Sequence, residues 1–180
     1  LADCRSVRGR PIPHIDRIGQ NSNGKRILVF GQIHGDETDS SQLALHWAER
    51  IESFDPHNTW RVVPLLNPDG KFLKTRGNAN GVDLNRNFPT TDWDKLAIKY
   101  WKTKTRGNDR RFPGAHAGSE PETRCAMAHL AAFKPDLVIS IHTPYGLLDF
   151  DGPRLKFPDF GALPWINLGT YPGSLGRYMW

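Results

Sequence analysis

Three short apolar segments, rich in β-branched side chains and bounded by polar or turn residues, stand out along the chain. They are KRILVFGQI (25–33), TWRVVPLL (59–66) and DLVISIH (136–142). A short apolar run between turn residues is typical of a buried strand. The pattern therefore predicts three strands over these ranges.

Two other segments show helical spacing. Between the first two strands, apolar residues recur three or four positions apart, which predicts a helix over 38–54 with this face on the core: Leu43, Trp47, Ile51 and Phe54. A further helix is predicted from Ser119, where SEPE matches a capping box, to Phe133. Strands that alternate with helices predict an α/β sheet covered on both faces.

Polar clusters follow each predicted strand directly. HGDE (34–37), NPDG (67–70) and HTPYG (142–146) begin where the apolar runs end. Ligands of open α/β sheets gather at the carboxyl ends of the strands. These three clusters therefore predict a functional site at that edge of the sheet.

His34 and Glu37 have the spacing of two ligands of one zinc ion, provided that Gly35 allows a sharp turn after the strand. His142, at the end of the third strand, is a candidate third ligand. A catalytic zinc site has three protein ligands and one open position. A structural histidine is the competing interpretation of His142.

A second His-x-x-Glu pair, His46 and Glu49, lies in the middle of the predicted helix. Unlike His34 and Glu37, this pair does not follow a predicted strand, so we interpret it as ordinary helix surface.

The segment from Asn67 to Pro89 is rich in turn residues and carries two arginines, Arg76 and Arg86. A guanidinium binds a carboxylate through two parallel hydrogen bonds, which lysine does not match. Asp83 has the chemistry to accept a proton from the far nitrogen of a zinc-bound imidazole. The alternative is an Asn/Gly-rich loop with incidental charges.

Composition narrows the class of protein. A length of 180 residues fits one domain, 1–180, and 24% charged with 38% apolar residues is typical of a globular chain. No apolar run has the roughly 20 residues that span a bilayer. The net charge of +5 favours anionic ligands, and the basic run 95–111 is either a solvated, partly helical segment or a patch for an acidic polymer. No nucleic-acid motif supports a nucleic-acid partner.

Two cysteines, Cys4 and Cys125, are too few to infer a disulfide framework. The first residue is Leu1 and not Met, so we expect that an upstream piece was removed or left out. Neither observation decides the compartment or the oligomeric state.

A set of ordered motifs resembles the zinc carboxypeptidase family. The motifs are HGDE, NPDG, KTRGN, GVDLNRNFP, GSEPET, SIH and YPGSLG. The similarity begins near Ser6–Ile12 and extends to the last residues, and TRGNANGVDLNRNFPT with PGAHAGSEPET is most similar to the bacterial murein tripeptide amidase branch. The resemblance implies a mixed, largely parallel β-sheet flanked by helices on both faces.

The resemblance also implies one zinc ion per chain, bound by His34, Glu37 and His142, with Asp83 as the hydrogen-bond partner of His34. These assignments match the candidates that the strand ends single out.

The same motifs imply roles for four further residues. Arg76 would polarise the scissile carbonyl and stabilise its oxyanion. Asn85 and Arg86 would bind the terminal carboxylate of the substrate, and Tyr171 matches a mobile tyrosine that closes over it.

The chain departs from the family at its end. The family's general base is a glutamate on a late strand, and this chain stops at Trp180 before the corresponding C-terminal strand and helix. None of the glutamates stands in the matching place: Glu37, Glu49, Glu52, Glu120 and Glu122. We expect either a fragment, a base supplied by a second chain, or a protein that binds without cutting. The 180-residue form is therefore expected to hydrolyse peptide poorly.

The function that these observations predict is zinc-dependent hydrolysis of an amide bond near the free C-terminus of a peptide. A murein peptide with a γ-D-glutamyl-diaminopimelate bond is the expected substrate, which places the protein in a bacterium, in either the periplasm and cell envelope or the cytoplasm. One alternative is an N-acyl amino acid deacylase that resembles succinylglutamate desuccinylase or aspartoacylase. Another is an inactive zinc-containing module that binds peptides.

Overall fold

The computed structural model of the chain describes residues 3–151 and 165–179. All predicted site residues lie within these ranges. The strands are β1 (Ile15–Arg17), β2 (Arg26–Phe30), β3 (Thr59–Val63), β4 (Leu137–Ser140), β5 (Leu148–Asp149) and β6 (Trp165–Ile166). The α-helices are α1 (Thr38–Phe54), α2 (Pro68–Leu73), α3 (Trp93–Lys104), α4 (Pro121–Phe133) and α5 (Leu175–Tyr178), and two 3-10 turns are η1 (Leu84–Arg86) and η2 (Asp109–Arg111). None of the helices in this described part is long and apolar enough to cross a membrane.

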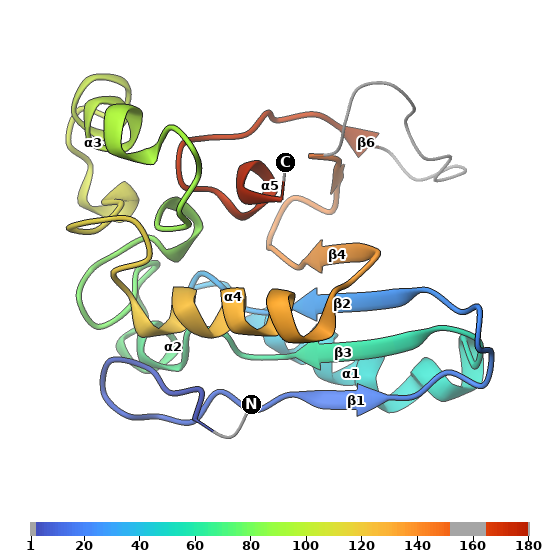
Figure 1. Ribbon diagram of the computed structural model, residues 1–180. Coiled ribbons are helices and arrows are strands. Elements are labelled where there is room, and N and C mark those ends of the chain that lie inside the picture. Colours follow the sequence, from blue (N-terminus) through green and yellow to red (C-terminus); the bar gives the residue numbers. More distant parts are fainter. Residues whose placement is uncertain (1–2, 152–164, 180) are drawn as a thin grey trace.

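The main sheet is mixed and largely parallel, as predicted. Its strand order is β1-β3-β2-β4, with β3, β2 and β4 parallel and β1 antiparallel to β3. Val29 lies opposite Val62 on one side and Ile139 on the other. All three predicted strands are present, but each ends two or three residues earlier than predicted. After each strand the chain turns into its polar cluster at the same edge of the sheet. That edge, where β2, β3 and β4 end, lies to the left in Figure 1.

Helices cover both faces of this sheet, with α4 in front and α1 behind in Figure 1. Alternate residues of each strand therefore enter two separate cores. The α4 side contains Leu28, Phe30, Val63, Ala126, Leu130 and Phe133. The α1 side contains Ile27, Val29, Val62, Ala44, Ala48 and Ile51.

The predicted extent of α1 is confirmed, but its predicted core face is wrong in part. Leu43 is 42% exposed and Phe54 is 55% exposed. The buried face is Ala44, Ala48 and Ile51, which also recur at helical spacing. Small alanine side chains let the helix approach the sheet closely, so the helix is rotated by about one residue from the face that the larger side chains indicated.

The predicted end of α4 is confirmed at Phe133, but the predicted capping box is wrong. The helix begins at Pro121, and Glu120 occupies the capping position without a side-chain cap. The Ser119 hydroxyl instead donates to the Glu120 carboxylate, at 2.6 Å. The same carboxylate accepts from the Asn78 amide at 2.7 Å, so tertiary contacts have replaced the local motif.

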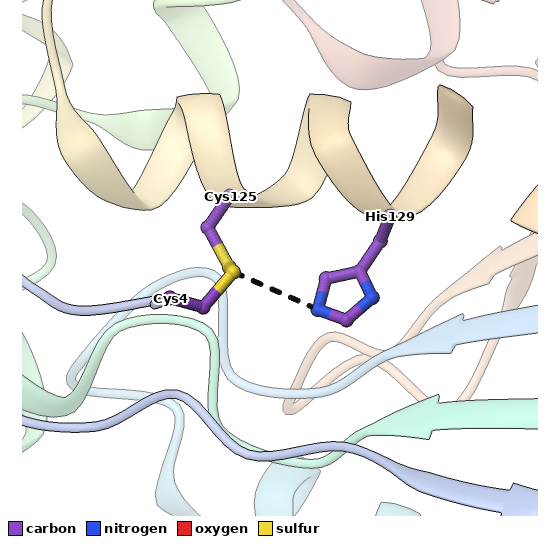
Figure 2. The surroundings of a disulfide bond; sticks show 3 residues. All are labelled: Cys4, Cys125 and His129. Atoms are coloured by element: carbon purple, nitrogen blue, oxygen red, sulfur yellow. Dashed lines mark hydrogen bonds between the residues drawn. A yellow bond between two sulfur atoms is a disulfide. The ribbon is translucent and has the colours of Figure 1, made fainter. Parts of the chain in front are cut away.

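A disulfide joins Cys4 to Cys125, although two cysteines alone did not predict it (Figure 2). The bond links the N-terminal segment to α4 across 121 positions of sequence, with the Cα atoms 5.4 Å apart. The fold, and not the local sequence, brings the two cysteines together.

Candidate zinc-binding and active site

The side chains of His34, Glu37 and His142 converge at the edge where β2 and β4 end. His34 Nδ1 and His142 Nδ1 lie 2.9 Å from the two carboxylate oxygens of Glu37, and 3.1 Å from each other. Ligands of a tetrahedral zinc ion are roughly 3.3 Å apart when the bonds are about 2.05 Å. The three donor atoms therefore need to move by only a few tenths of an ångström to surround a zinc ion.

The turn that carries His34 and Glu37 depends on close approach of two backbones. A Cβ atom on Gly35 would lie 2.1 Å from the carbonyl carbon of Gly70, so only glycine fits. Gly35 N donates to Arg76 O at 3.0 Å. The left-handed residue of this turn is Gln32, with φ 46°, and not Gly35, which corrects the expected reason for that glycine.

Asn67 connects the motifs that follow β2 and β3. Its amide nitrogen donates to Ile33 O at 3.2 Å and Arg76 O at 3.3 Å, and its amide oxygen accepts from Gly70 N at 2.9 Å. Asn67 is fully buried. These bonds hold the segment before His34 and the loop that carries Arg76 in one rigid unit.

Asp83 lies behind His34, on the side away from Glu37. Its Oδ1 is 3.2 Å from His34 Nε2, and its Oδ2 accepts from Arg76 Nε at 3.0 Å. The carboxylate is fully buried. Although burial favours the neutral acid, the charge and hydrogen bond of His34 and the charge of Arg76 hold the pKa of Asp83 far below its ordinary range. An ionised Asp83 orients the imidazole so that Nδ1 faces the cluster.

Glu37 is also held in its charged form. Burial opposes ionisation, but hydrogen bonds from His142 and His34 lower the pKa of Glu37 well below its ordinary value. Burial is the largest influence on the pKa of His34 and lowers it, but the charge and hydrogen bond of Asp83 together with the hydrogen bond of Glu37 outweigh burial, so the net shift is upward. Arg76 Nη1 lies 3.6 Å from Glu37 Oε1, which places a positive charge at the edge of the cluster.

Arg86 offers a second, separate positive charge. Its side chain is buried, its Nη1 donates to Asn85 O at 2.6 Å, and its Nε has no hydrogen-bond partner. Burial lowers the pKa of Arg86 from its usual high value. Among the described residues, no carboxylate forms an ion pair with it. A buried guanidinium with unused donors is suited to bind an anion.

The remaining predicted residues pack around Arg86. Asn85 Oδ1 accepts from Leu175 N at 2.8 Å, which joins η1 to α5. The Tyr171 ring covers the guanidinium of Arg86 and contacts the Tyr100 ring, 5.6 Å from centre to centre. All eight predicted site residues thus lie in one region, in two groups that centre on Glu37 and Arg86. His46 and Glu49 are exposed on α1, as expected for helix surface.

Three residues near Arg86 were missed by the sequence analysis. Trp93 Nε1 donates to Arg86 O at 2.9 Å. A Cβ atom on Gly173, whose φ is +81°, would lie 1.9 Å from that same carbonyl oxygen. Asp151 has a buried Oδ1 without a hydrogen-bond partner, and burial together with the charge of Asp149 raises the pKa of Asp151 to about 6. The YPGSLG motif contained a signal for Gly173; nothing local pointed to the other two.

Comparison with known proteins identifies the same family that the motifs resemble. Residues 4–148 match the family model described as zinc carboxypeptidase, Peptidase_M14. Murein peptide amidase A of Escherichia coli (strain K12) is 38% identical over 161 residues, which cover 84% of this chain and 64% of that protein. Murein peptide amidase A of Vibrio campbellii is 34% identical over 150 residues, with coverage of 81% and 58%. The chain therefore spans less than two thirds of the length of these relatives.

Solved structures confirm the predicted fold class. The murein-tripeptide amidase MpaA from Escherichia coli O157 matches with a TM-score of 0.67 at 30% identity, covering 97% of this chain and 75% of that chain. The carboxypeptidase A of Helicoverpa armigera has a TM-score of 0.61 at 23% identity, with coverage of 81% and 41%. The second match shows likeness of fold alone.

Proposed function

Because the chain belongs to the zinc carboxypeptidase family, we propose that it contributes the zinc site and carboxylate-binding site of a hydrolase that cleaves an amide bond near the C-terminus of a peptide. The observation that carries the proposal is the convergence of His34, Glu37 and His142 beside the Arg76 guanidinium. The buried Arg86 supplies a second positive charge within electrostatic range of Asp83 and Arg76. A metal ion and one guanidinium would bind the carbonyl of the scissile amide, and the second guanidinium would bind the terminal carboxylate.

The donor set fits one zinc ion. Two imidazole nitrogens and one carboxylate are a known set for catalytic zinc and leave the fourth position open. Asp83, bonded to the far nitrogen of His34, adds the outer contact that such imidazoles usually make. Zinc bound there would supply a Lewis acid for the scissile carbonyl and lower the pKa of a water molecule.

Arg76 is proposed to hold the carbonyl oxygen as negative charge develops on it. Its Nε is fixed by Asp83, while its Nη1 extends toward Glu37 at 3.6 Å, a separation that leaves the group available to a ligand. A donor that is already oriented before the reaction costs no reorganisation in the transition state. The buried Asp83 carboxylate thus positions both an imidazole and a guanidinium.

Arg86 and Asn85 are proposed to bind the free C-terminal carboxylate of the substrate. The guanidinium is held from one side by Asn85 O and from its face by Tyr171. When the C-terminal residue of the substrate is bound in this way, the amide bond that precedes this residue is proposed to lie toward the Glu37 cluster. Tyr171 is the group that would have to adjust as the carboxylate enters.

We propose a murein peptide with a γ-D-glutamyl-diaminopimelate bond as the substrate. Two relatives are named murein peptide amidase A. A second support is Asp151, whose pKa the charge of Arg86 lowers in opposition to burial, so the two groups lie within electrostatic range. Diaminopimelate carries both a carboxylate and an ammonium group, which match Arg86 and Asp151 in charge.

The test compares the zinc-loaded 180-residue chain, and any longer form that its gene encodes, on three substrates: the murein tripeptide, an ordinary L-peptide and succinylglutamate. We expect the murein tripeptide to be hydrolysed by a form that carries the family's general base and only poorly by the 180-residue chain. Asp151→Asn should reduce the preference for this tripeptide over the L-peptide. Hydrolysis of the L-peptide alone would overturn the substrate and keep the class. Hydrolysis of succinylglutamate alone would favour a deacylase, and peptide binding without hydrolysis of any substrate would favour an inactive module.

A further inference from the structure

A second group of side chains that could bind a metal ion surrounds the disulfide, apart from the residues of the proposed active site. Cys125 and His129 are four positions apart on α4 and therefore share one face of the helix. Cys4, from the N-terminal segment, completes the group (Figure 2). One ligand atom from each of the three lies within 4.8 Å of the others. None of these three side chains is hydrogen-bonded to a predicted active-site residue.

His129 is an unusual buried residue. Its side chain is fully buried, and its Nδ1 has no hydrogen-bond partner. Its Nε2 points at the disulfide in Figure 2 and lies 3.9 Å from Cys4 Sγ, a weak contact. The rings of His14 and Phe30 pack against it. Burying an imidazole with so little hydrogen bonding lowers the stability of the fold, so its presence calls for an explanation, such as a role as a metal ligand.

We propose that Cys4, Cys125 and His129 bind a second zinc ion when the disulfide is reduced. A dithiol reductant supplies two electrons and two protons, becomes a disulfide itself, and converts the protein S–S bond into two thiols. Zinc then binds the two thiolates and His129 Nε2, and the two thiol protons are released to solvent. When a disulfide reagent accepts the two electrons and becomes a dithiol, the protein S–S bond forms again, no thiolate remains, and the ion is released.

The geometry is close to that of such a site. A tetrahedral ion with Zn–S bonds of about 2.3 Å and a Zn–N bond of about 2.05 Å separates sulfur from nitrogen by roughly 3.5 Å and the sulfurs by roughly 3.7 Å. The present Cys4 Sγ–His129 Nε2 distance of 3.9 Å already approaches the first value. Once the S–S bond is broken, rotation of the cysteine side chains can separate the two sulfur atoms to roughly 3.7 Å without movement of α4.

The site is accessible to ions. A surface hollow of about 450 Å³ is lined by both cysteines and by Asp3, Arg5 and Arg124. It gives a path for the reductant and the metal, and a water molecule from it would complete the coordination. Two thiolates and an imidazole select zinc and other soft ions over magnesium and calcium.

The experiment measures zinc equivalents in His34→Ala protein, in which the active-site ligand set is broken. We expect about one equivalent after reduction by a dithiol and almost none in the oxidised form. Cobalt(II) added to the reduced protein should give a thiolate-to-metal charge-transfer band. Zinc should raise the melting temperature of the reduced form only.

Matched variants separate this site from adventitious binding. Cys4→Ser and Cys125→Ser should abolish the equivalent bound by the reduced protein. His129→Gln should weaken it by more than the roughly 10- to 100-fold typical of losing an outer hydrogen bond to a ligand, and His46→Ala should not change it. The proposal is overturned if the reduced His34→Ala protein, with two titratable thiols and a native circular dichroism spectrum, binds no zinc. It is equally overturned if the reduced protein loses its native spectrum, or if His129→Gln binds zinc as tightly as its parent. None of these results depends on the peptidase activity.

Discussion

The guanidinium carbon of Arg86 lies 4.4 Å from the centre of the Tyr171 ring. The ring covers one face of the cation, and Nη1 of the same guanidinium donates to the Asn85 carbonyl. A carboxylate therefore has to approach the guanidinium along its edge, in the plane where both hydrogen bonds form. This relationship connects the proposed carboxylate site to the segment before α5.

Replacing Arg86 with lysine should weaken binding of a peptide with a free C-terminus. Loss of a charge-assisted pair of hydrogen bonds typically costs about 1.5 to 3 kcal/mol, or roughly 10- to 150-fold in affinity. Amidating the peptide should have a similar effect on the unmodified protein and little further effect on Arg86→Lys. A binding titration with both peptides measures this, and equal affinities for free and amidated peptide would refute the assignment.

Tyr171→Phe and Tyr171→Ala should behave differently. Phenylalanine keeps the aromatic face over Arg86, whereas alanine removes a cation–π contact worth about 0.5 to 2 kcal/mol. We expect Tyr171→Ala to weaken peptide binding roughly 2- to 30-fold and Tyr171→Phe to bind nearly normally. If Tyr171→Phe loses as much affinity as Tyr171→Ala, the hydroxyl and not the ring makes the important contact.

Removing one zinc ligand should remove the metal. In the disulfide-intact protein, we expect about one equivalent of zinc, with most of it lost in His34→Ala and in His142→Ala because two ligands do not hold the ion. His46→Ala is the control, since that imidazole is exposed on α1. Elemental analysis after dialysis measures the content. Loss of zinc in His46→Ala with retention in His34→Ala would show that the wrong pair was chosen.

Asp83→Asn should keep the zinc ligands and weaken the metal site. The carboxylate accepts from both His34 and Arg76, and loss of such an outer contact typically lowers metal affinity roughly 10- to 100-fold. Competition with a chelator measures this affinity, and thermal unfolding checks that the variant is folded. Asp94→Asn, an exposed carboxylate on α3, is the matched control and should bind zinc normally.

His129 should make the protein less stable at acidic pH. Burial, with the charges of His14 and Arg61, lowers the pKa of His129 to about 4 in the folded state, against about 6.5 when unfolded. Between these values the unfolded chain binds a proton that the folded chain does not, so the free energy of unfolding falls as the pH is lowered. The expected loss from this group is roughly 2 to 3 kcal/mol between pH 7 and pH 4.5.

Urea unfolding of the oxidised protein over that pH range provides the measurement. His129→Gln should show a shallower decrease in the free energy of unfolding than the parent protein. The same pH dependence in both proteins would show that His129 is not the group responsible.

The sequence alone was sufficient wherever a property is local. Apolar runs between turn residues identified β2, β3 and β4, because strand formation depends on neighbouring side chains. Ordered motifs identified the family. The helical period located α1 but not its buried face, since Ala44 and Leu43 both recur at that period and only contact with the sheet distinguishes them.

Tertiary structure decided whatever depends on residues that are distant in sequence. Gly35 is required because Gly70 approaches it, Trp93 and Gly173 support Arg86, and Cys4 meets Cys125 and His129. The HGDE and YPGSLG motifs contain Gly35 and Gly173, but the contacts themselves are not predictable from the local sequence, because each depends on how β2, β4 and the helices pack. The ligand types were thus readable along the chain, while their geometry arises from parallel strands that end at one edge of the sheet.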